Sequence, residues 1–215
     1  MEFPSLLDLL SIQHTFLRVF GYEMSFLEFA GTLLNLASVW LVSRGRLSNW
    51  PIGIAGALVF ALFFYQLRLY ADFLEQLYYI GASVYGWRLW LEQGGGSEAF
   101  RPRYSSKGTL ALALAVTLVL SICGALLLMR VHEVWPRAFP EPASLPWLDS
   151  LTTVGSFTAM ILMAKKRTEV WLYWLLLNAI SIGLYAFKGT YFVAALYGVY
   201  LILAVVGWRR WLARG

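Results

Sequence analysis

Two short series of polar and aromatic side chains recur at helical spacing in this chain. Asp72, Gln76 and Tyr79 share one face of a predicted helix, and Glu75 lies beside them. The second series advances in steps of three and four residues along one face: Trp171, Trp174, Asn178, Ser181 and Tyr185. Ionisable and amide groups are unfavourable within apolar helices, so they normally face a cavity or the interior of a bundle. We therefore expect these two series to line a binding site.

The two series differ in chemistry, because one supplies carboxylates and an amide while the other supplies indoles and an amide. Aromatic faces and carboxylates both attract cations, so a divided site suits an asymmetric ligand with a flat cationic part and a hydroxylated part. Lys188 follows the second series. Its side chain either extends to the membrane interface or pairs with Asp72 or Glu75 as a gate.

The sequence carries no signature of catalysis or of a bound cofactor. It has no P-loop, dinucleotide fingerprint, His-Glu-x-x-His motif or Ser-His-Asp set. His14 and His132 stand apart from other potential metal ligands. We predict a protein that is not an enzyme and needs no cofactor or metal.

The composition indicates a protein of the lipid bilayer. Hydrophobic residues make up 60% of the 215 residues and charged residues only 13%, which exceeds the apolar content that a soluble domain needs for its core. The segment from Gly108 to Met129 contains no ionisable Asp, Glu, Lys, Arg or His. The net charge of +5 comes from short basic clusters between apolar segments, which favours membrane topology signals over a nucleic-acid interface.

Seven membrane spans are predicted from hydropathy. They are Met24 to Ser43, Trp50 to Gln66, Ala71 to Leu91, Gly108 to Met129, Trp147 to Ala164, Val170 to Phe187 and Tyr191 to Leu212. With seven spans the chain ends lie on opposite sides, and most of the 17 Lys and Arg residues fall on the C-terminal side. The positive-inside rule then predicts a cytoplasmic C-terminus and an external N-terminus. We expect Trp87, Trp90, Trp208 and Trp211, near span ends, to form interfacial belts.

The chain contains an internal repeat. An offset of 121 residues aligns Trp50 with Trp171 and the block Gly86 to Trp90 with the block Gly207 to Trp211. In the first span, matching Gly31 with Gly155 needs an offset of 124. The fourth span makes the two three-helix copies parallel, which is an architecture of transporters that hold the substrate between their halves. The absence of a nucleotide site favours downhill or ion-coupled transport over ATP-driven pumping.

The fold prediction is an all-α integral membrane protein of seven helices in a 3+1+3 arrangement. Its segments are an N-terminal amphipathic interfacial helix (1–23), a first repeat (24–91), a loop and linker helix without polar features (92–130), an outer loop (131–146) and a second repeat (147–212).

The pattern resembles the Pnu vitamin transporters of bacteria, in particular those that carry nicotinamide riboside. The resemblance runs from about Glu28 to Trp211 and rests on three groups of residues. These are Tyr70-Ala71-Asp72 with Gln76, Tyr85-Gly86-Trp87 with Trp90, and Trp171-x-x-Trp174-x-x-x-Asn178 with Leu184-Tyr185. Glu75, between the matched Asp72 and Gln76, departs from the family pattern.

The resemblance implies a 3+1+3 fold similar to that of the SWEET sugar transporters, assembled as a homotrimer in the bacterial inner membrane. It also implies facilitated diffusion of nicotinamide riboside, made one-way by a cytoplasmic kinase. By the same resemblance, Gln76, Trp174 and Asn178 contact the substrate, while Trp50, Asp72, Tyr79 and Trp171 lie near the pocket or its gates. Related members carry thiamine or riboflavin, which remain alternative substrates.

A second hypothesis from another class is a non-transporting membrane scaffold or binding subunit. The polar series within the apolar spans weigh against it, because such a role does not require amides inside a span.

Overall fold

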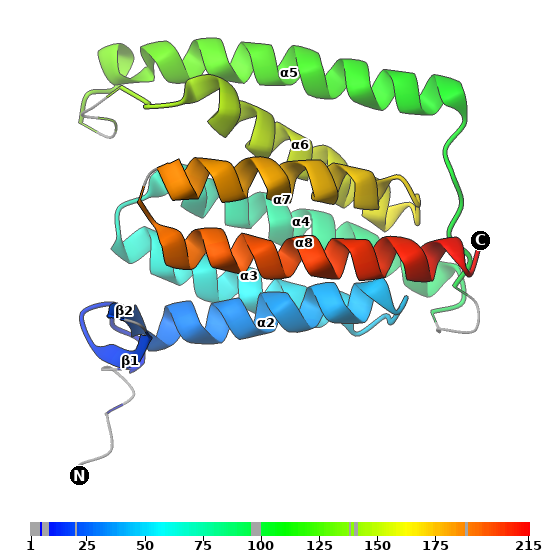
Figure 1. Ribbon diagram of the computed structural model, residues 1–215, viewed down its shortest axis with the longest axis horizontal. Coiled ribbons are helices and arrows are strands. Elements are labelled where there is room, and N and C mark those ends of the chain that lie inside the picture. Colours follow the sequence, from blue (N-terminus) through cyan, green and yellow to red (C-terminus); the bar gives the residue numbers. More distant parts are fainter. Residues whose placement is uncertain are drawn as a thin grey trace. The chain divides into compact units, whose positions relative to one another are not determined.

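The computed structural model describes residues 5, 9–19, 21–95, 100–137, 139, 142–187 and 189–215. The elements, labelled in Figure 1, are β1 (Thr15–Val19), β2 (Tyr22–Ser25), α2 (Phe26–Ser43), α3 (Asn49–Gln66), α4 (Tyr70–Glu92), α5 (Lys107–Val134), α6 (Pro146–Ala164), α7 (Val170–Phe187) and α8 (Tyr191–Leu212). The chain divides into two compact units, residues 1–99 and 100–215, here called the first and second units.

In the first unit α3 packs against both α2 and α4. Glycines on α3 allow the close approach to α2: a Cβ at Gly53 would lie 2.9 Å from the hydroxyl of Ser38, and one at Gly56 would lie 3.2 Å from the amide oxygen of Asn35. The Ser38 hydroxyl donates to the carbonyl of Asn49 at the start of α3. Small residues facing polar ones are a common way to join membrane helices, because they let the backbones come close.

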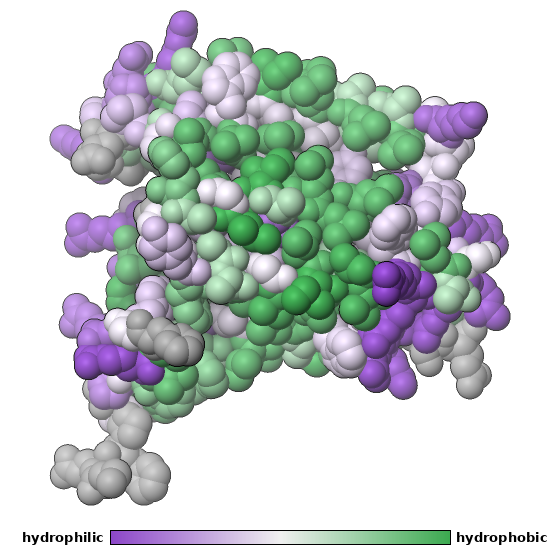
Figure 2. All heavy atoms as spheres, viewed as in Figure 1, coloured by the Kyte–Doolittle hydropathy of each residue, from purple (hydrophilic) through white to green (hydrophobic). Residues whose placement is uncertain are grey.

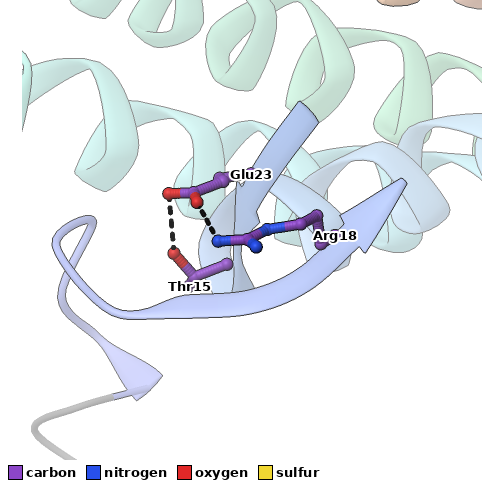
Figure 3. Close-up of polar contacts among 3 residues, drawn as sticks. All are labelled: Thr15, Arg18 and Glu23. Atoms are coloured by element: carbon purple, nitrogen blue, oxygen red, sulfur yellow. Dashed lines mark hydrogen bonds and ion pairs between the residues drawn. The ribbon is translucent and has the colours of Figure 1, made fainter. Parts of the chain in front are cut away.

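The predicted N-terminal amphipathic helix (1–23) is wrong for residues 15–19 and 22–23, which belong to the antiparallel strands β1 and β2 at the start of α2 (Figure 1). Gly21, with φ at +84°, provides the turn. Across the strands Arg18 pairs with Glu23, whose carboxylate also accepts a hydrogen bond of 3.3 Å from Thr15 (Figure 3). β-Branched and aromatic residues in this segment favour extended backbone, which outweighed the apolar helical spacing. Residues 1–4 and 6–8 lie outside the described part.

The second unit contains α5, α6, α7 and α8. Thr117 of α5 shares a 2.8 Å hydrogen bond with Thr158 of α6, and the Ser150 hydroxyl donates to the carbonyl of Ser121 at 2.8 Å. Thr117, Ser121 and Ala125 are buried and follow one another at four-residue steps. The expectation that this helix lacks polar features is therefore wrong, because these small residues form an interface with α6. The role of α5 as a linker stays a prediction.

Six of the helices in the described ranges are long and apolar enough to cross a membrane: α2, α3, α5, α6, α7 and α8. α4 has 23 residues but carries Asp72, Glu75, Arg88 and Glu92. Hydrophobic residues occupy the middle of the helices and hydrophilic residues gather at their ends on the face shown in Figure 2. The chain is thus a multi-pass membrane protein, with α4 the helix whose span rests on the sequence prediction alone.

The turns of the two units match at the predicted offset of 121. α3 and α7 begin and end at positions 121 apart. The backbone is left-handed at Gly45 and Lys166, and again at Arg68 and Gly189. The turn hydrogen bonds match as well: Arg46 N to Leu41 O at 3.1 Å corresponds to Arg167 N to Leu162 O at 2.9 Å. α2 and α6 also end 121 residues apart and are continuous helices, so the separate offset of 124 for Gly31 has no structural counterpart.

Candidate functional site

The inward face of α4 carries the first predicted series. Gln76 is only 8% exposed, and Asp72, Glu75 and Tyr79 are half-buried. The Tyr79 hydroxyl donates to a carboxylate oxygen of Glu75 at 3.0 Å. Leucines at positions 74 and 77, on the opposite face, are exposed. Gln76 therefore lies on a buried face of α4, and the role of this series in a binding site stays a prediction.

α7 presents the second series in the same way. Asn178 and Ser181 are each 5% exposed, while Trp174 and Tyr185 are half-buried. Leu172 and Leu176 point to the exposed side of this helix. Among the described residues, the buried polar atoms without a hydrogen-bond partner include the indole nitrogens of Trp50 and Trp171 but not the amides of Gln76 and Asn178. Buried polar groups are unfavourable unless protein, water or a ligand satisfies them.

Trp50 and Trp171, which the resemblance places near the pocket, pack in the same manner in their respective units. The Trp50 ring lies edge-on to Trp90, with centroids 5.3 Å apart, and covers Gly86. Trp171 lies edge-on to Trp211 at the same distance and covers Gly207. The interfacial-belt interpretation is therefore wrong for Trp90 and Trp211, which are buried against neighbouring helices.

Two tyrosines of α8 belong with the α7 series and were not singled out from the sequence. Tyr197 stacks on Tyr185 with ring centroids 5.2 Å apart and an angle of 13° between the planes. Tyr200 contacts Tyr197 edge-on at 6.1 Å. These tyrosines occupy the positions that correspond, at an offset of 121, to Gln76 and Tyr79. That correspondence is the signal that could have identified them.

A segment before α5 docks onto the turn between α6 and α7. Arg103 exchanges backbone hydrogen bonds with Lys166 and Thr168, at 3.0 and 3.1 Å. The buried carboxylate of Glu169 accepts from the backbone N–H of Ser105 at 3.1 Å. Phe100, 1% exposed, lies 4.9 Å from the ring of Trp211. These contacts attach the segment to the end of the second unit that carries basic residues such as Arg103 and Lys166.

The electrostatics outside the spans show two altered groups. Burial lowers the pKa of the Lys166 ammonium, whose nitrogen lies 5.5 Å from the centre of the Phe100 ring. Burial, together with a 2.6 Å hydrogen bond to Glu28, raises the pKa of Tyr22 above its usual range. In the described ranges no group of three or more His, Cys, Asp or Glu could hold a metal ion. Lys188, the predicted gate cation, lies outside the described residues.

The sequence matches a known protein family and several of its members. The model of the family described as nicotinamide mononucleotide transporter matches residues 25–213. The chain is 28% identical to the nicotinamide riboside transporter PnuC of Escherichia coli (strain K12), over 96% of this chain and 95% of that protein. It is 26% identical to the riboflavin/roseoflavin transporter RibM of Streptomyces davaonensis, over 91% and 89% of the two chains.

One solved structure shares the fold. The crystal structure of the vitamin B3 transporter PnuC superposes with a TM-score of 0.65 and 23% identity, covering 87% of this chain and 81% of that one.

Proposed function

The chain belongs to the nicotinamide mononucleotide transporter family, and from that premise we propose that it carries nicotinamide riboside across the bacterial cytoplasmic membrane. The relatives in Escherichia coli and Haemophilus influenzae are nicotinamide riboside transporters. The observation that carries the proposal is the pair of buried amides, Gln76 and Asn178, on helix faces that also hold aromatic rings. Amides bond ribose hydroxyls, and aromatic faces favour a flat cationic ring.

The charges on the helices favour the riboside over its phosphorylated form. α2, α3, α6 and α7 contain no Lys or Arg, and the basic residues of α4 and α8 lie near their C-terminal ends. A phosphate group within the membrane would call for such cations. α4 instead carries Asp72 and Glu75, which favour a positively charged substrate.

The proposed binding residues are Gln76, Tyr79, Trp174, Asn178, Ser181, Trp50 and Trp171, with Asp72, Glu75, Tyr185 and Lys188 at the gates. In this proposal the two three-helix repeats and the connecting helix form the 3+1+3, SWEET-like arrangement, and the protein works as a homotrimer with its N-terminus outside. Transport is uniport by alternating access, and a cytoplasmic kinase traps the product. The matched turns at an offset of 121 support the repeat.

Uptake into proteoliposomes tests the transport step. Labelled nicotinamide riboside should equilibrate without ATP or an ion gradient, and should accumulate only when a riboside kinase and ATP are inside. A requirement for a sodium or proton gradient would contradict uniport. Riboflavin and thiamine, tested in the same assay, distinguish the alternative vitamins; preferential uptake of either one would overturn the proposed substrate.

The amides give the sharpest variants. Asn178→Leu and Gln76→Leu should each lower uptake about 10- to 100-fold, because each removes a hydrogen bond to the substrate from a site that excludes water. Ser156→Ala on α6 is the matched control: Ser156 is buried, but its hydroxyl bonds to the carbonyl of Thr153 in its own helix. Normal function in Asn178→Leu, with no ligand-induced thermal shift in the unaltered protein, would favour the scaffold hypothesis instead.

A further inference from the structure

Glu75 is a carboxylate in the helix whose membrane span is least apolar. It lies beyond the first turn of α4, whereas Asp72 lies within that turn. The unpaired N–H groups at the start of a helix stabilise a carboxylate such as that of Asp72. Glu75 is too far along the helix for that explanation. A carboxylate within a membrane span is unfavourable and is usually functional.

The geometry directs Glu75 away from the exposed side of α4. Glu75, Tyr79, Ala82 and Gly86 follow one another at steps of four, three and four residues, and the last two are buried. The hydrogen bond from the Tyr79 hydroxyl fixes one carboxylate oxygen. A carboxylate can accept several hydrogen bonds and attract a cation at the same time.

The corresponding positions of the second unit lack this charge. At an offset of 121, Asp72 corresponds to Val193 and Glu75 to Leu196, while Tyr79 corresponds to Tyr200. The tyrosine is therefore common to both units, and the carboxylate belongs to the first unit alone. A packing role shared by the repeats does not explain a carboxylate that only one of them carries.

We propose that Glu75, oriented by Tyr79, makes the transporter selective for substrates with a fixed positive charge. The inference rests on the proposed function, because the charge it recognises is the pyridinium ring of nicotinamide riboside. A carboxylate near this ring attracts the cation and gains nothing from an uncharged ring of similar shape. Glu75, proposed above as a gate residue, is thus also specificity-determining, and Tyr79, proposed above as a binding residue, also positions it.

The test compares two substrates that differ in charge. Initial uptake rates are measured in proteoliposomes, with no membrane potential, for nicotinamide riboside and for its uncharged dihydropyridine form. In Glu75→Gln the rate for the cation at subsaturating concentration should fall about tenfold, equivalent to about 1.4 kcal/mol. The rate for the neutral form should hardly change. Tyr79→Phe should shift the ratio of the two rates in the same direction by a smaller factor.

Glu92→Gln is the matched control, because Glu92 is an exposed carboxylate at the end of the same helix. It should leave the ratio unchanged. An unchanged ratio in Glu75→Gln, or an equal fall for both substrates, would overturn the role of Glu75 while the transport function stands. If Glu75→Gln does not fold, the ratio in Tyr79→Phe decides the matter. Unaltered protein that moves neither substrate would overturn the proposed function and this inference together.

Discussion

The two units repeat their scaffold and differ in their polar faces. In the first unit Trp50 lies on Gly86 and beside Trp90. The second unit places Trp171, Gly207 and Trp211 in the same relation, with the same centroid distance of 5.3 Å. Large aromatic rings buried on glycines are sensitive to small changes in volume. The comparison indicates that this end of each unit is constrained by packing.

The polar residues show the opposite behaviour. Asn178 of α7 corresponds to Ala57 of α3, and Gln76 of α4 corresponds to Tyr197 of α8. All four positions lie on helix faces that pack inward, so the units offer different chemistry from equivalent places. A purely structural repeat does not require such a division, and this is one reason why we propose a substrate with two unlike ends.

Removal of the Phe100 ring should have the largest effect on stability, and it acts on the second unit. Phe100 adds a third ring to the indole pair of the second unit. Phe100→Ala should lower the free energy of unfolding by about 3 to 5 kcal/mol, because it leaves a cavity against Trp211. Thermal unfolding of the purified protein measures the loss. Tyr104→Ala, at an exposed position of the same segment, should change little, and equal losses in both variants would refute the packing role.

Substitution of Gly86 and Gly207 tests whether the two units pack a tryptophan on a glycine equally tightly. A Cβ at Gly86 would lie 2.4 Å from the Trp50 ring, and one at Gly207 would lie 2.3 Å from the Trp171 ring. Gly86→Ala and Gly207→Ala should each lower the free energy of unfolding by about 1 to 3 kcal/mol, because buried rings must shift.

The controls for these substitutions lie on the same helices. Gly81 of α4 and Gly198 of α8 have open space at the Cβ position. Gly81→Ala and Gly198→Ala should raise stability by up to about 1 kcal/mol, because alanine favours the helix. A large loss of unfolding free energy in Gly86→Ala, with none in Gly207→Ala, would show that the two tryptophan–glycine contacts are not equivalent.

The turn between α3 and α4 and the turn between α7 and α8 provide a further comparison of the two units, with a smaller expected effect on stability. Arg68 and Gly189 occupy equivalent left-handed positions, with φ of 58° and 74°. Arg68→Gly should raise the free energy of unfolding by about 0.5 to 1 kcal/mol, and Gly189→Ala should lower it by a similar amount, since only glycine adopts this backbone without strain. Paired thermal unfolding curves measure both. Opposite signs for the two substitutions are the required result.

Much of the fold follows from local patterns in the sequence. Hydropathy located the helices to within a few residues, because apolar spans must be long enough for the bilayer. Helical spacing placed Gln76 and Asn178 on buried faces, because a helix has a fixed period. The roles of these residues in substrate binding remain predictions, since they depend on a ligand.

The errors arose where local pattern and tertiary contact disagree. A tryptophan near the end of a span has the same local signal whether it lies at the interface or packs against an aromatic ring of a neighbouring helix. Trp90 and Trp211 do the latter, against Trp50 and Trp171. The helical interpretation of the N-terminal segment rested on Leu6, Leu7, Leu10 and Leu17, yet Leu17 lies in a hairpin that a turn at Gly21 permits.

The sequence by itself determined that this chain is helical, apolar enough for a membrane and carries residues that match at an offset of 121, because composition and spacing are properties of the linear chain. Only the tertiary structure decided that Trp50 and Trp171 rest on glycines of α4 and α8, that Tyr79 donates a hydrogen bond to Glu75, and that α5 packs on α6 through small polar residues. Those contacts depend on which side chains different helices bring within a few ångströms, and spacing along one helix does not specify its neighbour.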